Sequence, residues 1–208
     1  MMNYGLPYMG SKNKIAKKIV ELLPSGERLV DLMAGGCAIT HAALLSGKWK
    51  TVHANDINPK IVQLFKDALE GKFEDEKRWI SREDFFRLKD TDELVKVCWS
   101  FGNDQRTYMY GKPIEPYKRA CHYAVVFDDW SEFERLCPET VGAAREALKG
   151  MPVGTWQERK ARRLKFGPSV VHEVKRLKMT NEQIEGNPLY KSIKRRHTPN
   201  GRWELEVL

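Results

Sequence analysis

Short apolar runs alternate with helical periodicities in the N-terminal third of the chain, and this alternation constrains the fold more than any other feature. A helix is expected within residues 11–23. Residues 28–33 form an apolar run, a Gly-Gly turn follows, and residues 38–45 have helical spacing. A second run at residues 51–55 leads to an Asn-Pro helix start and a helical pattern over residues 58–69. Strands alternating with helices over short connections predict an α/β fold with a doubly wound, Rossmann-like parallel sheet.

The composition fits a folded domain rather than a disordered chain or a disulfide scaffold. Of the 208 residues, 41% are hydrophobic and 31% are charged. The four cysteines form no C-x-x-C pair, so we expect buried thiols and no metal site. The most apolar stretch, residues 29–45, is interrupted by Asp31 and His41, and no basic segment leads into an apolar one at the N-terminus. We therefore expect a cytoplasmic protein with no membrane partner.

The remainder of the chain has a different character. A third strand is expected at residues 78–81, and helices are expected at residues 92–101 and 115–127. An aromatic-rich polar loop separates these two helices. The alternation of apolar residues at 203–207 predicts a final strand.

Capping signals predict further helices in the C-terminal part. Thr155 with Glu158, and Thr180 with Gln183, have the spacing of capping boxes. Pro168 indicates another helix start, because proline is favoured in the first helical turn.

Three features of the sheet region share one order and indicate a cofactor site. Gly35 and Gly36 follow the first strand, Asp56 ends the second, and Asp84-Phe85 follows the expected third. Glycine lets the backbone approach a ligand, and a carboxylate after the second strand can accept hydrogen bonds from ribose hydroxyls. An Asp-Phe pair can bind an adenine amino group and cover the ring. Since G-x-G-x-x-G is absent, S-adenosylmethionine (SAM), which has no phosphate, fits better than a dinucleotide.

Four segments resemble motifs of the Dam-like DNA adenine-N6 methyltransferases. They are Tyr8-Met9-Gly10-Ser11-Lys12, Asp31-Leu32-Met33-Ala34-Gly35-Gly36, Asn55-Asp56-Ile57-Asn58 and the block Trp99–Lys118. The last looks like the middle region of phage and gut-bacterial members. The likeness extends over about residues 4–130.

This resemblance implies roles for individual residues. Tyr8 and Lys12 would flank the methionine end of SAM, Asp31 and Gly35 would cradle the cofactor, and Asp56 would hold its ribose. The resemblance also implies double-stranded DNA as the substrate.

The sequence departs from the family pattern at two places. Cys37 stands where the glycine motif normally has a second glycine, which is compatible with SAM binding and also with weaker SAM binding. The catalytic tetrapeptide Asp-Pro-Pro-Tyr is not found. In the family this tetrapeptide accepts the hydrogens of the adenine amino group and stacks on the flipped base, which positions the amino nitrogen for attack on the methyl group.

Two segments are candidates for the missing tetrapeptide. In Asn187-Pro188-Leu189-Tyr190, Asn187 could accept the amino hydrogens and Tyr190 could stack on the base. The preceding residues are polar rather than a buried strand, which favours a turn. The apolar run at residues 124–130 ends in acid but has no following proline, and a helix accounts for it better.

The positive charge is concentrated at one end of the chain. The net charge is +8, yet residues 1–150 hold 23 basic and 22 acidic side chains, whereas residues 151–208 hold 13 and 6. Basic clusters interleaved with aromatic residues favour a nucleic-acid surface. The loop at residues 103–107 offers side-chain types that read base edges. The predicted DNA contacts are Arg106, Arg162, Arg163, Arg195 and Arg196.

The sequence therefore predicts a SAM-binding Rossmann-like part at 1–90, a helical recognition region at 91–150 and a basic DNA-facing segment at 151–208. One hypothesis is a SAM-dependent DNA adenine-N6 methyltransferase acting on duplex DNA. The alternative is a catalytically incomplete DNA- and SAM-binding relative, or half of a split enzyme in which a second polypeptide supplies the catalytic motif. A third is an RNA methyltransferase. The missing tetrapeptide leaves open whether the sheet is complete.

Overall fold

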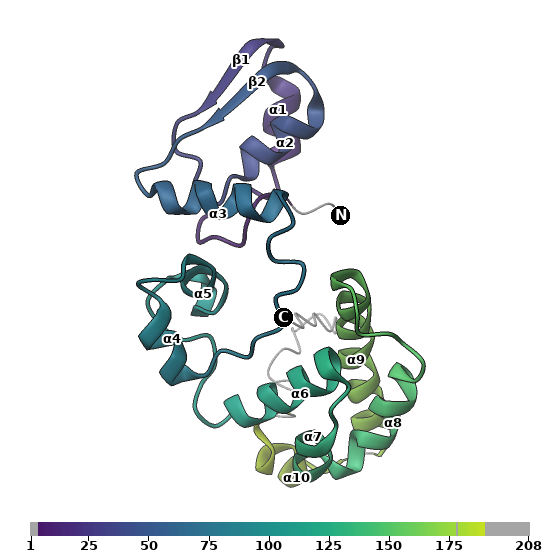
Figure 1. Cartoon of the computed structure of the whole chain (residues 1–208). Coiled ribbons are helices and arrows are strands. Elements are labelled where there is room, and N and C mark those ends of the chain that lie inside the picture. Colours follow the sequence, from purple (N-terminus) through teal and green to yellow (C-terminus); the bar gives the residue numbers. More distant parts are fainter. Residues whose placement is uncertain (1–3, 178, 190–208) are drawn as a thin grey trace. The chain divides into compact units, whose positions relative to one another are not determined.

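The chain forms two compact units in a computed structural model that describes residues 4–177 and 179–189 (Figure 1). Of the described residues, unit 1 comprises 4–73 and 80–109, and unit 2 comprises 74–79, 110–177 and 179–189. These divisions differ from those expected at residues 90 and 150. The helix after residue 92 packs on the sheet part, and the long basic helix packs on the helices before residue 150.

Unit 1 is built on two parallel strands. β1 (Gly26–Asp31) pairs with β2 (Trp49–Ala54), with Leu29 opposite Val52 and Asp31 opposite Ala54. This confirms the two strands expected from the apolar runs. Within the described residues the sheet has these two strands alone.

Helices cover one face of this sheet. The helices of unit 1 are α1 (Ala16–Leu22), α2 (Ala38–Ser46), α3 (Pro59–Leu69), α4 (Arg82–Leu88) and α5 (Glu93–Cys98), with a 3₁₀ turn η1 (Phe101–Asn103). Figure 1 shows α1 and α2 beside the strands, and their alanines and Val20 form a core with Leu29 and Val52. As the sequence predicts, Asn58 caps α3 by accepting a hydrogen bond from the Lys60 N–H at 3.2 Å.

The other face of the two strands is exposed. Paired residues of parallel strands lie on one face, and the face opposite Leu29 and Val52 presents Arg28, Val30 and His53. All three are exposed, and Val30 retains 50% of its accessible surface. A parallel sheet normally has both faces covered. In this part of the chain the strands are therefore covered on one side only.

The expected third strand at residues 78–81 is wrong. Ser81 caps α4 by accepting a hydrogen bond from the Asp84 N–H at 3.1 Å, and Glu83 and Asp84 lie in the first turn of that helix. A serine cap followed by acidic residues stabilises a helix N-terminus, so the chain turns into a helix here.

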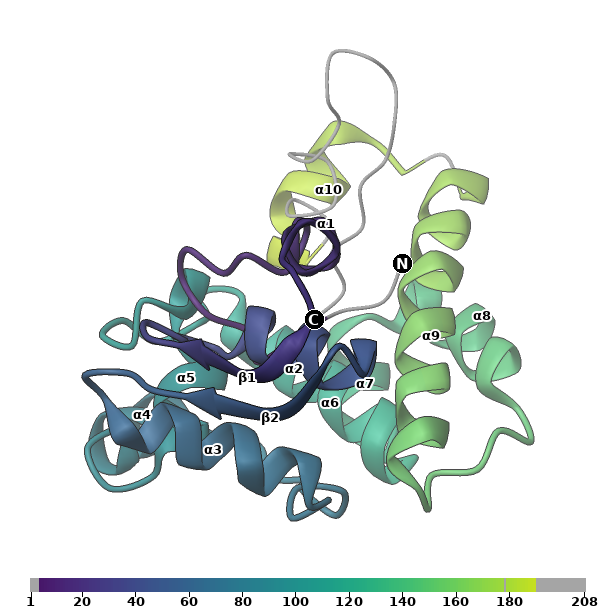
Figure 2. The same ribbon diagram turned by 90° about the horizontal axis from the view of Figure 1, so that it is seen from above.

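Unit 2 contains only helices among its described residues. They are α6 (Glu115–Phe127), α7 (Ser131–Leu136), α8 (Pro138–Leu148), α9 (Trp156–Arg176) and α10 (Asn181–Gly186). Both views show α8 and α9 side by side (Figures 1 and 2). Trp130, Phe133 and Phe166 meet in the core, with ring centroids 5.2–6.2 Å apart. The helix expected at residues 115–127 is confirmed.

Both predicted capping boxes are present, but the helix start predicted at Pro168 is wrong. The Thr155 N–H donates to the Glu158 carboxylate at 2.7 Å, and the second box joins Thr180 and Gln183. Pro168 lies inside α9. Proline removes a single helical hydrogen bond, and burial of Phe166 and Val170 on either side holds the helix through that position.

The predicted strand at residues 203–207 lies outside the described residues. No helix within residues 4–177 and 179–189 has the length and apolarity needed to cross a membrane.

Candidate functional site

The loops that follow β1 and β2 are joined at the carboxyl end of the sheet. The Asn55 N–H donates to the Asp31 carbonyl at 2.8 Å, and the Ala34 N–H donates to the Asn55 carbonyl at 2.9 Å. Gly35 then adopts a φ of +48°, which favours glycine. The two loops form one surface, at the edge where open parallel sheets bind ligands.

Asp56 fixes this surface through both oxygens of its carboxylate. Oδ2 accepts a hydrogen bond from the Gly35 N–H at 2.8 Å, and Oδ1 accepts one from the Asn58 N–H at 3.0 Å. The side chain is half-buried. Because each carboxylate oxygen can accept two hydrogen bonds, Asp56 retains capacity for a ligand hydroxyl.

Asp31 acts on the helix that follows the glycine turn. Its Oδ2 accepts hydrogen bonds from the Thr40 hydroxyl at 2.7 Å and from the Thr40 N–H at 3.2 Å. This holds the first turn of α2 against the end of β1, and thereby positions the loop between them.

The N-terminal loop packs directly on the glycine turn. The Leu6 N–H donates to the Gly36 carbonyl at 2.7 Å, and a Cβ on Gly36 would lie 2.7 Å from the Cβ of Tyr8. A Cβ on Gly35 would lie 3.2 Å from the Tyr8 ring. Lys12 is exposed, and its Nζ donates to the Gly10 carbonyl at 2.9 Å. The structure thus brings Tyr8 together with both glycines.

The backbone conformation of Cys37 explains why the family pattern has a glycine at this position. Its φ is 60° and ψ is 31°, the left-handed region, which costs a non-glycine residue about 1 kcal/mol. The side chain is fully buried against α3, next to Phe65 and Ile61 in the same core. Burial and the nearby Asp31 and Asp56 raise the pKa of the thiol to about 12.

The structure corrects the role predicted for Asp84 and Phe85. Both lie on α4 and not after a strand. Phe85 is fully buried beside Tyr108, with ring centroids 5.7 Å apart, so its ring is not available to cover an adenine. Asp84 binds Ser81 and pairs with Arg87 at 2.5 Å.

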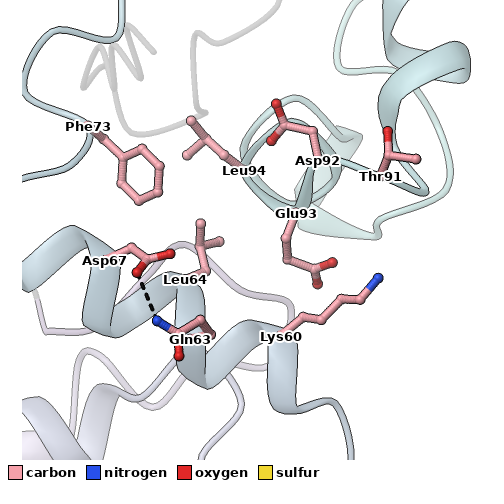
Figure 3. Close-up of a pocket in the computed structure, with 9 residues that line it drawn as sticks. All are labelled: Lys60, Gln63, Leu64, Asp67, Phe73, Thr91, Asp92, Glu93 and Leu94. Atoms are coloured by element: carbon pink, nitrogen blue, oxygen red, sulfur yellow. Dashed lines mark hydrogen bonds between the residues drawn. The ribbon is translucent and has the colours of Figure 1, made fainter.

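A cavity of about 380 Å³ lies elsewhere in unit 1, between α3 and the start of α5 (Figure 3). Leu64, Phe73 and Leu94 contribute apolar walls, and Glu93 at its edge accepts a hydrogen bond from the Asn58 side chain at 2.9 Å. None of the residues predicted to bind SAM lines it. It is therefore separate from the glycine turn, although Asn58 contacts both regions.

Three exposed apolar residues next to the site, which we call the apolar rim, were not among the residues predicted from the sequence: Leu32, Met33 and Ile57. Leu32 and Met33 follow β1 and are 66% and 89% exposed, and Ile57 follows Asp56 and is fully exposed. Their sequence signal is an apolar residue placed directly after a strand end. Exposed apolar side chains that gather at one edge often mark a contact surface.

The comparisons with known proteins decide the family. A model of the D12 class N6 adenine-specific DNA methyltransferases matches residues 8–119, more than half of the chain. The chain belongs to this family. No curated protein and no solved structure matches it.

The residues of this D12 family member fit SAM, the cofactor typical of the family. Asp56, whose Oδ2 accepts a hydrogen bond from the Gly35 N–H, has spare acceptor capacity for a ribose, whereas the tight packing of Gly35 and Gly36 is against Tyr8 of the chain itself. The glycine turn does not contain G-x-G-x-x-G, the motif that binds a pyrophosphate, which is compatible with a cofactor without phosphate. Among the described residues, no cluster of three or more His, Cys, Asp or Glu side chains could hold a metal ion.

The candidate tetrapeptide at residues 187–190 lies in unit 2, after α10. The Asn187 Oδ1 accepts a hydrogen bond from the Leu189 N–H at 3.0 Å, and Leu189 is buried in the unit 2 core. The sequence favoured a turn, whereas the structure shows a bend at Asn187 followed by helical Pro188 and Leu189, with Asn187 in the position of a helix cap. Pro188 is half-buried, and Tyr190 lies outside the described residues. The other candidate, residues 124–130, begins within α6.

The residues predicted to contact DNA differ in their exposure. Arg162 is 1% exposed and donates to backbone carbonyls, so its predicted DNA contact is wrong: a side chain enclosed in the unit 2 core cannot reach a phosphate. Arg163 and Arg106 are exposed. Arg195 and Arg196 lie outside the described residues.

The loop containing Arg106 is held by its own hydrogen bonds. Asp104 accepts from the backbone N–H groups of Arg106 and Thr107 at 2.8 and 2.9 Å, and the Asn103 side chain donates to the Val97 carbonyl at 3.0 Å. Of the side chains expected to read bases, Asn103 and Asp104 are therefore used within the loop, while Arg106 is exposed.

Proposed function

We propose that this chain binds SAM at the carboxyl end of β1 and β2 and serves as the cofactor-binding part of a DNA adenine-N6 methyltransferase that acts on duplex DNA. One observation supports this most: the Asp56 carboxylate bridges the Gly35 N–H and the Asn58 N–H, and so joins the two loops that a nucleoside must contact. Membership of the D12 family supplies the reaction class.

Each residue of the site has a distinct part in this proposal. Asp56 accepts hydrogen bonds from the ribose hydroxyls, and the Gly35-Gly36 backbone allows close approach of the cofactor. Tyr8, which packs over the glycine turn, and Lys12 flank the methionine end, while Asp31 and Gly35 cradle the cofactor. SAM, when bound, supplies an electrophilic methyl group on a positively charged sulfur.

The catalytic part is proposed to come from a polypeptide segment outside these residues. The sequence contains no Asp-Pro-Pro-Tyr, and the Oδ1 of Asn187 already accepts a hydrogen bond from the Leu189 N–H. Two observations indicate room for a further segment: β1 pairs on one side only among the described residues, and Val30 and the apolar rim are exposed. An unpaired strand edge readily accepts another strand. These observations favour the split or incomplete form over a self-sufficient enzyme.

SAM binding by the full chain tests the cofactor proposal. Titration calorimetry should show binding by the wild type, with at least a 10-fold loss in Asp56→Ala, because a hydrogen bond to a charged group contributes about 1.5–3 kcal/mol. Asp90→Ala is the matched control, since Asp90 is an exposed carboxylate of unit 1 at a distance along the chain from the site. Equal affinity in wild type and Asp56→Ala, or no binding at all, would refute the proposal.

Methyl transfer tests the second part. Labelled SAM and unmethylated duplex DNA should give no incorporation with this chain alone, and incorporation when a polypeptide containing an Asp-Pro-Pro-Tyr strand is added. Incorporation by the chain alone would show that it needs no second polypeptide.

A further inference from the structure

The basic residues near the start of α9 divide into two groups that differ in exposure. Arg159 and Arg162 are 5% and 1% exposed and point into unit 2, where they bind backbone carbonyls. Lys160 and Arg163 are exposed. The first pair is structural, and the second is available to a partner.

Lys160 and Arg163 lie on one side of α9 together with Trp156. Residues spaced by three and four positions project from the same side of a helix. Trp156 is 46% exposed, and the Lys160 ammonium lies 4.7 Å from its ring centroid. At the other end, Arg163 lies near Tyr110, whose ring stacks on Trp79 with centroids 5.6 Å apart. Lys160 therefore contacts an aromatic ring, and Arg163 lies close to an aromatic pair. We call Trp156, Lys160 and Arg163 the α9 strip.

The cations of the α9 strip have no carboxylate partner within the described residues. Other arginines of unit 2 are paired: Arg119 with Glu132 at 2.7 Å, and Arg176 with Glu173 at 2.5 Å. Desolvation lowers the pKa of Arg163, with Tyr110 partly opposing this effect. A partly desolvated guanidinium without a counterion is stabilised by an anion, and its planar fork matches the oxygens of a phosphate.

We propose that the α9 strip binds the phosphate backbone of duplex DNA. The identity of the partner rests on the proposed function, which makes DNA the substrate, whereas the location rests on the unpaired cations and the exposed tryptophan. Such contacts position a protein on DNA without reading its sequence.

The experiment measures binding of the full chain to a fluorescent, unmethylated duplex of roughly 20 base pairs, long enough for two helical turns. Anisotropy titrations between 50 and 200 mM salt give the affinity and its salt dependence. Each phosphate contact contributes about 0.9 to the slope of log K against log salt. Lys160→Ala and Arg163→Ala should each lower that slope by about 0.9. Together the two contacts should make the wild type lose about 10-fold more affinity than the double variant when salt rises from 50 to 200 mM.

Lys165→Ala is the matched control. It removes an exposed lysine from the same helix, five positions from Lys160 and therefore on a different side. It should leave the slope and the affinity unchanged. A loss in Lys165→Ala equal to that in Lys160→Ala would overturn the proposal, because it would indicate a general charge effect. An unchanged slope in the double variant, or no duplex binding by the wild type, would also overturn it.

Two further arms separate the α9 strip from other partners and from the proposed function. A loss confined to a single-stranded oligonucleotide, or to vesicles of anionic phospholipid, would assign the strip to that partner and overturn duplex binding. SAM calorimetry on the double variant should match the wild type. If Asp56→Ala and the wild type bind SAM alike while the α9 strip variants lose duplex affinity, the cofactor proposal fails and the proposal that the α9 strip binds DNA is supported.

Discussion

Replacement of Arg162 separates a structural role from a DNA-binding one. Its Nε donates to the Val125 carbonyl at 2.8 Å, Nη2 to the Ala124 carbonyl at 2.9 Å, and Nη1 to the Met151 carbonyl at 2.7 Å. These carbonyls lie in the last turn of α6 and just after α8. Helix ends leave carbonyls without helical partners, and Arg162 satisfies them from α9.

The burial of Arg162 sets the size of the stability loss expected when it is replaced. The ion pair with Asp128 adds little, because Asp128 is 58% exposed. Removing a buried charged group that satisfies several carbonyls typically costs about 3–5 kcal/mol. Arg162→Ala should therefore lower the free energy of unfolding by about 3 kcal/mol or more, and Arg162→Lys should recover only part of it, since an ammonium has three donors and no fork.

Urea unfolding followed by circular dichroism measures this loss, and hydrogen exchange localises it. Exchange should accelerate in α6, α8 and α9. Lys165→Ala, an exposed change on the same helix, should stay within about 0.5 kcal/mol of the wild type. A loss below about 1 kcal/mol in Arg162→Ala, accompanied by weaker DNA binding of a folded protein, would contradict the structural role and restore the role predicted from sequence.

Three further results are expected in unit 1. Gly36→Ala should displace the loop containing Tyr8 and abolish SAM binding, because the added Cβ would lie 2.7 Å from that side chain. Gly26→Ala, whose Cβ would lie 3.9 Å from the Trp49 ring, should retain binding, and calorimetry checks both. Cys37, whose pKa is raised to about 12, should resist alkylation at pH 8 until urea unfolds the chain, and rapid labelling of the native protein would refute its burial. Burial lowers the pKa of His41, whose Nδ1 accepts a loop N–H at 3.0 Å. The unfolded chain then binds the proton more readily, so stability should be complete above about pH 6.5 and decline as the pH falls below it; an unchanged urea midpoint between pH 7.5 and 5.5 would argue against this.

Local signals in the sequence predicted much of unit 1 and of the candidate site. The two strands taken singly, the cap at Asn58 and the placement of Asp56 after β2 depend on residues that are close together in the sequence. The gathering of Asp56 and Gly35 follows from the parallel topology, because both follow strand ends at one edge. The third strand expected at residues 78–81 does not form, because these residues lead into the helix that Ser81 caps and that begins at Arg82.

By itself, then, the sequence determined the elements whose causes are local, together with the family. Only the tertiary structure decided which basic side chains are interior. Arg162 and Arg163 are neighbours of one type, yet helical geometry turns one toward the ends of α6 and α8 and the other outward. Arg162 shares its side of α9 with the buried Phe166 and Val170, but the carbonyls that it meets there belong to helix ends distant in the sequence. The left-handed backbone of Cys37 likewise depends on the loop that packs against it.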